Sequence, residues 1–187
     1  TLDILVNCHG ITHLQKAEEF PIAVWDQMLE INLTSVFLLC QLAGRVMLEK
    51  GRGKIINIAS LLSFQGGLTV PAYAASKGAV AQFTKSLSNE WASQGVNVNC
   101  IAPGYMATEM NTALIADATR SRQIMDRIPA GRWGKPEDMV GAVVYLVPMV
   151  RDAIKAVPYT YWESARDLGG TKVECITRAV LPMAMPR

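Results

Sequence analysis

The sequence lacks several features that define particular classes of protein. No uninterrupted apolar run reaches the ~20 residues that a membrane span needs, so we expect no membrane insertion. Lys plus Arg number 18 against 16 Asp plus Glu, an excess too small to indicate a nucleic-acid partner. The four cysteines have no metal-like spacing, and scattered cysteines suit a reducing compartment better than a disulfide framework. We therefore expect a cytoplasmic protein.

Regular alternation of strand and helix patterns is what the sequence does contain. Apolar residues make up 50% of the 187 residues, enough for one globular core. Short apolar runs, rich in β-branched residues, are separated by long helical patterns, which predicts an α/β fold with a parallel sheet. The predicted strands lie at 2–7, 54–60 and within "VNVNCIAPG" (96–104), and the helices between them at 21–48 and 71–93.

Beyond residue 108 the strand pattern stops and only helical patterns follow. The candidate helices are 108–127, 136–146, 149–156, 162–168 and 172–181. Ligands of parallel sheets bind beyond the carboxyl ends of the strands. The segments 7–10, 60–67 and 103–108 are therefore the candidate binding segments.

Tyr73 and Lys77 are the residues on which a catalytic site could be built. Residues four apart share a helix face, so both side chains should point to the same side. A nearby ammonium favours the phenolate and lowers the pKa of a tyrosine, which would let Tyr73 exchange a proton with a substrate oxygen. Ser60 ends the middle strand at the same sheet edge, and Asn32 places an amide in an apolar helical run. The alternative is a tyrosine that packs on the core beside a solvated lysine.

Several motifs together resemble the short-chain dehydrogenase/reductase family: "LVNCHG", "INLTSVF", "IINIAS", "YAASK" and "NVNCIAPGYMAT", over residues 2–146. The resemblance implies hydride transfer with NAD or NADP, NAD being favoured, on a Rossmann-like sheet. It also implies helices on both faces of a sheet that lacks the family's first and last strands. The implied catalytic residues are Asn32, Ser60, Tyr73 and Lys77. The implied cofactor-binding residues are Asn7, Cys8, Gly10, Tyr73, Lys77, Pro103, Gly104 and Thr108, with no metal.

Within the family, "SLLSFQGGLTVPAYAASKGAV" and "IPAGRWGKPEDM" are most similar to the sugar-acid dehydrogenases. That similarity implies a small sugar-acid substrate, such as a deoxy-gluconate or gluconate, whose secondary alcohol and ketone are interconverted. In the family, the helices 32–49 and 72–93 form a subunit interface, so a homo-oligomer through them is an expectation. Simple burial of these helices in the core explains their apolar faces equally well.

Two departures from the family pattern bear on activity. The strand-end motif reads Asn7-Cys8-His9-Gly10 where the family usually has Asn-Asn-Ala-Gly, so a cysteine replaces an amide near the cofactor ribose. The family's G-x-x-x-G-x-G phosphate loop is absent, and the chain begins with Thr1 rather than Met. We therefore interpret the chain as a truncated piece, and a catalytically inactive fragment is the alternative to an enzyme.

The C-terminal residues 147–187 have a different resemblance. Glu163, Gly169, Ile176 and Leu181-Pro182 are similar in spacing to the coupling-loop motif of ABC transporter permeases of the phosphate-uptake type. Two plain amphipathic helices around a glycine turn would give the same pattern. We accordingly expect a dehydrogenase domain at 1–146 and an all-helical, permease-like segment at 147–187, and a transporter-related protein is a further alternative.

Overall fold

Three parallel strands form the sheet that positions the candidate site. The computed structural model describes residues 2–146, and it places β1 (Ile4–Asn7), β2 (Gly53–Ile58) and β3 (Val96–Ile101) in the order β1-β2-β3. Asn7 lies opposite Asn57 in the register, and Asn57 lies opposite Cys100. The carboxyl ends of all three strands therefore meet at one edge. The predicted parallel three-stranded sheet with helices is confirmed.

The helices fall close to their predicted positions, with two differences that matter for the site. The predicted helix 21–48 contains a π-helical turn, and the predicted helix 108–127 is broken at Asp117. The helical segments are η1 (Ala17–Glu19), α1 (Ile22–Leu29), η2 (Glu30–Thr34), α2 (Ser35–Glu49), η3 (Leu61–Ser63), α3 (Pro71–Trp91), η4 (Ala92–Gln94), η5 (Glu109–Asn111), α4 (Thr112–Ala116), α5 (Ala118–Met125), η6 (Pro136–Met139) and α6 (Val140–Leu146).

The chain divides into two compact units, 1–139 and 140–187. Of the second unit, only α6 belongs to the described residues. The predicted helices 149–156, 162–168 and 172–181 lie outside the described residues, as does the permease-like motif. The proposed division at residue 146 stays a prediction.

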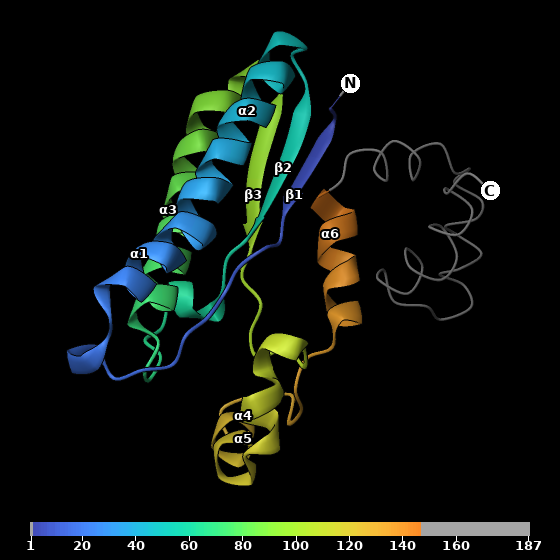
Figure 1. Cartoon of the computed structure of the whole chain (residues 1–187). Helices are drawn as coiled ribbons and strands as arrows, with labels where there is room; N and C mark the ends of the chain where they lie inside the picture. The colour runs from blue at the N-terminus through green and yellow to red at the C-terminus, as the bar shows by residue number, and fades with distance from the viewer. Residues whose placement is uncertain (1, 147–187) are drawn as a thin grey trace, which may run out of the picture. The chain divides into compact units, whose positions relative to one another are not determined.

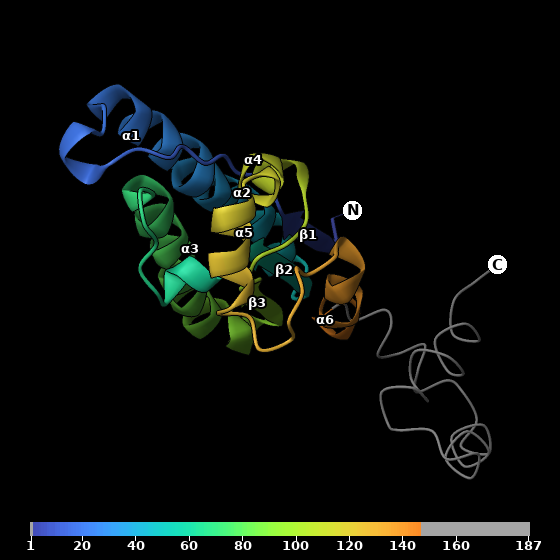
Figure 2. The same ribbon diagram turned by 90° about the horizontal axis from the view of Figure 1, so that it is seen from below.

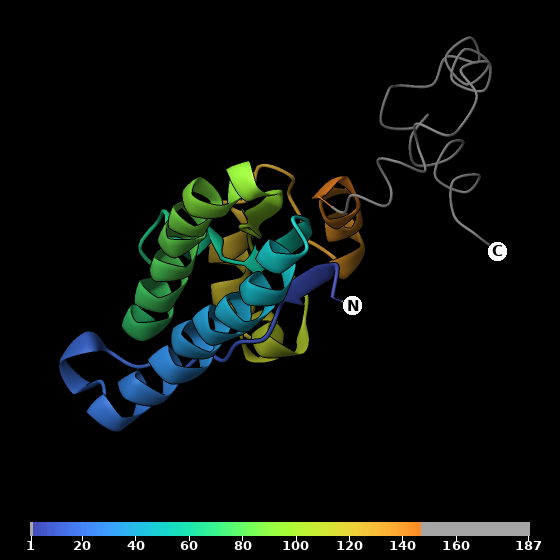
Figure 3. The same cartoon turned by 90° about the horizontal axis from the view of Figure 1, so that it is seen from above.

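The main core of the first unit lies between one face of the sheet and the helices α2 and α3. In α2, Val36, Cys40, Ala43 and Met47 are buried, a spacing that places them on one helix face. They pack with Ile55 of β2 and with other buried residues of β3 and α3. Figures 1 and 3 show α2 and α3 lying side by side.

The continuous helical run Ile22–Glu49 is long and apolar enough to cross a membrane by length and composition. A core helix of a soluble protein passes the same test. The buried side of this run, which includes Met28 and Met47, contributes to the interior of the first unit. The expectation of no membrane insertion stays a prediction.

The segment after β3 turns back beyond the carboxyl ends of the strands, where α4 and α5 lie (Figures 1 and 2). Asp117 causes the break between these helices, because its carboxylate accepts hydrogen bonds from the Thr119 and Arg120 N–H groups and so caps α5. The Trp133 indole N–H donates to Ser121 Oγ of α5 at 3.2 Å. This contact ties α5 to the following loop.

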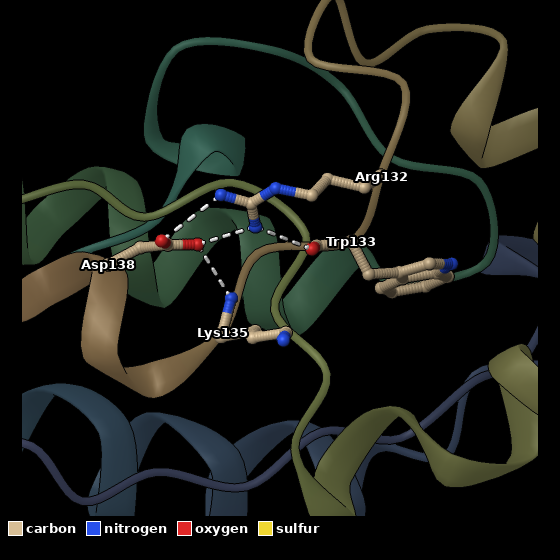
Figure 4. A network of polar contacts seen from close by, with 4 residues as sticks. All are labelled: Arg132, Trp133, Lys135 and Asp138. Atoms are coloured by element: carbon tan, nitrogen blue, oxygen red, sulfur yellow. Dashed lines mark hydrogen bonds and ion pairs between the residues drawn. The ribbon is translucent and has the colours of Figure 1, made fainter.

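That loop is held by a network around Asp138 (Figure 4). The Arg132 guanidinium donates two hydrogen bonds to the Asp138 carboxylate, at 2.7 and 3.1 Å. The Lys135 backbone N–H donates to the same carboxylate at 2.8 Å. A β-bridge between Met106 and Gly134 then connects the loop to the segment after β3.

Candidate active site

Asn32 is fully buried in the π-helical turn between α1 and α2. Its Nδ2 donates to the Ile11 carbonyl at 2.9 Å, and its Oδ1 accepts from the Ile11 N–H at 2.8 Å. Nδ2 also lies 3.3 Å from Ser76 Oγ, which donates to the Tyr73 carbonyl. The widened turn directs one amide at both the segment after β1 and helix α3. The sequence required a partner for a buried amide in an apolar helix, and the Ile11 backbone supplies it.

Lys77 lies on α3 and is only 4% exposed. Its ammonium donates to the carbonyl of Ile58, the last residue of β2, at 2.7 Å. A Cβ built on Gly10 would stand 3.5 Å from Lys77 Nζ and 3.2 Å from Asn32 Oδ1. The backbone after β1 therefore passes directly beside the lysine and the amide, at a position where glycine leaves the room for this approach.

Tyr73 and Ser60 lie together at the same edge. Ser60 follows β2 and caps η3, since its Oγ accepts from the Leu62 N–H at 3.1 Å. Ser63 fixes this turn against α3, because its Oγ donates to the Lys77 carbonyl at 2.7 Å. Lys77 Nζ lies 5.9 Å from the centre of the Tyr73 ring. The structure thus brings all four predicted catalytic residues to the carboxyl ends of β1 and β2.

Burial controls the proton affinities of both titratable groups. It raises the pKa of Tyr73, and a hydrogen bond with the Ser60 side chain acts in the opposite direction. Burial lowers the pKa of Lys77 to about 8, and a smaller electrostatic effect of Cys8 raises it. The sequence predicted a Tyr73 pKa lowered by the lysine, and this direction is wrong for the residues described. Desolvation of the phenol is the larger effect, and the effect that opposes it is the hydrogen bond with Ser60 rather than an attraction by Lys77.

The residues predicted to contact the cofactor are placed differently from one another. Cys8 is exposed, and Gly10 faces Asn32 and Lys77 as described above. Asn7 is buried, and its Nδ2 donates to Asn57 Oδ1 at 2.9 Å and to Cys40 Sγ at 3.3 Å. The amide of Asn7 therefore belongs to a polar cluster beneath the strand ends. A contact of Asn7 with a ligand would use its backbone.

On the far side, Pro103 and Gly104 follow β3. The Pro103 carbonyl accepts from the Leu61 N–H at 2.8 Å, which joins the segments after β2 and β3. Gly104 lines a cavity with Ser60 and Tyr73. Thr108 is exposed and precedes η5. The predicted cofactor contacts of these three residues stay predictions.

The cavity beside Ser60 and Tyr73 has a volume of about 430 Å³. Leucines of the loop 61–68 form one wall, and residues 104–127 form the other. The second wall could not be predicted from the sequence, because it depends on how α5 folds back after the break at Asp117. Ser76 was not predicted either, although a serine one helical turn after Tyr73 is a signal for it.

The two histidines after β1 each lie beside a protein side chain. His9 Nε2 lies 2.7 Å from Ser35 Oγ, and His13 Nε2 lies 3.1 Å from Gln15 Oε1. Among residues 2–146 no group of three or more His, Cys, Asp or Glu side chains could hold a metal ion.

Comparison with known proteins decides the family. The family model described as short chain dehydrogenase matches residues 1–119. The chain belongs to the short-chain dehydrogenase family.

Relatives of this short-chain dehydrogenase include enzymes of sugar-acid metabolism. The 2-dehydro-3-deoxy-D-gluconate 5-dehydrogenase of Bacillus subtilis is 56% identical over 153 residues, which cover 82% of this chain and 60% of that protein. The Escherichia coli protein of the same name is 49% identical over 154 residues, covering 82% of this chain and 61% of the relative. The chain thus spans about 60% of the length of these relatives.

A solved structure of the family has the same fold. The gluconate 5-dehydrogenase of Burkholderia cenocepacia, crystallised with NADP and tartrate, is 42% identical with a TM-score of 0.76. The match covers 78% of this chain and 57% of that one.

The described residues of this short-chain dehydrogenase fit the nicotinamide end of a dinucleotide. Lys77 Nζ carries three protons, and residues 2–146 give it one acceptor, the Ile58 carbonyl. The two remaining N–H groups of the Lys77 ammonium, beside Gly10, would therefore be available to the hydroxyls of a ribose. No described segment combines a strand, a glycine-rich turn and a helix in the order that a pyrophosphate site requires.

Proposed function

We propose that this chain carries the catalytic part of an NAD(P)-dependent oxidoreductase. The enzyme interconverts a secondary alcohol and a ketone on a sugar acid such as a deoxy-gluconate or gluconate. The single observation that carries the proposal is that Ser60 and Tyr73 line one cavity, with Lys77 Nζ 5.9 Å from the centre of the Tyr73 ring. The names of its relatives support the substrate class.

Each side chain has a role that follows from its surroundings. The raised pKa keeps Tyr73 protonated, so its hydroxyl can donate a proton to the oxygen of a ketone. Ser60 holds the same oxygen, because both hydroxyls border the cavity. Lys77 orients the ribose of the cofactor through its free protons, and Asn32 fixes the Ile11 backbone beside it. The nicotinamide, when bound, supplies or accepts the hydride.

The choice of cofactor is part of the proposal. The sequence favoured NAD, while the related Burkholderia structure contains NADP. The described residues hold only the ribose next to the nicotinamide, which both cofactors share. Titrations with both reduced cofactors are therefore needed.

The test uses the full chain and the Tyr73→Phe variant. NADH and NADPH binding is measured by the change in cofactor fluorescence, and reduction of a 5-keto-gluconate is then followed by loss of absorbance. We expect binding in both proteins and turnover in the natural sequence alone. Failure of the natural chain to bind either cofactor would overturn the proposal and favour the inactive fragment.

Self-association and a cytoplasmic location complete the proposal. The outward side of α2 exposes several large apolar side chains, which supports a homo-oligomer through the helices 32–49 and 72–93. These side chains are Phe37, Leu38, Leu39, Leu42 and Val46. Light scattering after gel filtration tests this assembly, and a monomer at micromolar concentration would contradict it.

The segment 147–187 stays proposed as permease-like and separate from the dehydrogenase domain. Its residues are outside the described part of the chain, so the support is the spacing of its sequence motif alone. Removal of 147–187 should leave cofactor binding unchanged if the segment has no part in catalysis. A loss of binding in that shortened chain would contradict the proposed division.

A further inference from the structure

The charged residues of the cavity beside Ser60 and Tyr73 are all of one sign. Arg120 and Arg127 line it, and no Asp or Glu of the described chain does. The remaining lining residues are apolar or neutral polar side chains and glycines. A cavity of about 430 Å³ with two cations in its wall is suited to a small anion that also carries apolar or hydroxylated carbon.

Both arginines belong to one face of the segment that begins with α5. Arg120, Gln123, Ile124 and Arg127 follow the spacing i, i+3, i+4 and i+7, and all four line the cavity. Ile124 is only 7% exposed and packs inward, whereas Gln123 and Arg127 line the cavity as exposed residues. The Asp117 cap and the hydrogen bond between Trp133 and Ser121 hold the helix in this orientation.

Neither guanidinium is neutralised by a carboxylate of the described residues. The ion pairs within residues 2–146 join Lys50 and Arg52 to Asp3, and Arg132 to Asp138. A guanidinium in a partly enclosed site favours an oxyanion, and its planar fork of N–H donors matches the two oxygens of a carboxylate.

We propose that Arg120 and Arg127 bind the carboxylate of the substrate and thereby set the specificity of the enzyme. Ser60 and Tyr73 border the same cavity, where they hold the reacting oxygen. Gln123, between the two arginines on the helix face, is placed to donate to a hydroxyl of the same molecule. This assignment rests on the proposed function for its reacting group, while the anion selectivity follows from the cavity itself.

The test measures binding, so that it does not depend on turnover. Gluconate and glucitol differ only in a carboxylate against a hydroxymethyl group, and both are titrated by calorimetry into the full chain. The variants are Arg120→Gln and Arg127→Gln. Arg122→Gln is the matched control, because Arg122 is an exposed residue of the same helix that does not line the cavity.

We expect the natural chain to bind gluconate at least about tenfold more tightly than glucitol, as one charged contact is sufficient for such a ratio. Arg120→Gln and Arg127→Gln should each lose roughly tenfold in gluconate affinity, with little change for glucitol. Arg122→Gln should match the natural chain. Equal losses for gluconate and glucitol, a loss in Arg122→Gln, or no gluconate binding by the natural chain would overturn the assignment.

The same experiment separates this assignment from the proposed function. If the chain binds gluconate through the two arginines but shows neither NADPH binding nor turnover, the carboxylate site stands and the oxidoreductase proposal is refuted. If both arginine variants reduce a 5-keto-gluconate with the same kcat/KM as the natural chain, the oxidoreductase proposal stands and the carboxylate site is refuted.

Discussion

Replacement of Lys77 by methionine should change how the free energy of unfolding depends on pH. A pKa lowered from 10.5 to about 8 means that the folded protein binds the ammonium proton less tightly than the unfolded chain does. The difference corresponds to roughly 3 kcal/mol that disfavours the charged lysine in the fold. Methionine has a similar length without a charge, so Lys77→Met removes this term. The loss of the hydrogen bond to the Ile58 carbonyl opposes the gain by about 1–3 kcal/mol.

The sign of the pH dependence is the sharper part of this prediction. Between pH 8 and 10.5 the unfolded lysine retains its proton and the folded one loses it, so the free energy of unfolding rises with pH. We expect the natural chain to gain roughly 2–3 kcal/mol relative to Lys77→Met from pH 7 to pH 10. Other titrating groups, including Tyr73, cancel in the difference between the two proteins to first order.

Urea unfolding followed by tryptophan fluorescence at several pH values measures this difference. Lys85→Met is the control, because Lys85 is an exposed residue of the same helix and its removal eliminates no buried charge. A constant difference between the natural chain and Lys77→Met from pH 7 to 10 would refute the reasoning. Such a result would mean that water or the Ile58 carbonyl solvates the ammonium enough to cancel the effect of burial.

Three further changes test the supports around the site. Asn32→Ala leaves the Ile11 N–H and carbonyl without their partner and should lower the free energy of unfolding by about 2–4 kcal/mol in urea, whereas a loss under ~1 would contradict a supporting role. Gly78→Ala should raise the free energy of unfolding by about 0.5–1 kcal/mol, because a Cβ there meets nothing closer than 4.0 Å and alanine favours helix. A decrease in thermal unfolding experiments would indicate a steric clash. The pKa of the Asp138 carboxyl, measured by NMR titration, should be about 2, because its hydrogen bond with the Arg132 guanidinium is the largest cause of the lowering. In Arg132→Ala this pKa should rise toward its ordinary value of 3.8, and an unchanged pKa would refute that cause.

Local sequence patterns predicted the strands well, because each strand of a parallel sheet is apolar on both faces and is ended by a turn. Ile55 and Ile56 point to opposite faces of β2, and both are fully buried. The helical position of Asn32 was also predictable, but the π turn was not. One extra residue in a turn changes no periodicity over a short run, although it decides where the amide points.

Long-range contacts account for what the sequence could not predict. Asn7 is the last residue of β1, and its amide turns inward to Asn57 and Cys40 because those partners lie beneath it. Arg120 stands in a polar helical run with no local signal of a binding role. Its place in the cavity wall depends on the break at Asp117 and on the loop that holds α5.

The arrangement of hydrogen bonds explains why these candidate catalytic groups keep their geometry at a sheet edge. The buried polar side chains bond to backbone groups just beyond the strands: Lys77 to the carbonyl that ends β2, and Asn32 to Ile11 after β1. The hydrogen bonds between β1 and β2 fix these backbone positions, so the alignment of the two strands also sets the relative positions of the Lys77 and Asn32 side chains. β1 pairs with one strand of the described sheet, whereas β2 pairs with two. Opening of β1 would release Ile11 and with it the Asn32 amide, so the position of this buried amide depends on the order of β1.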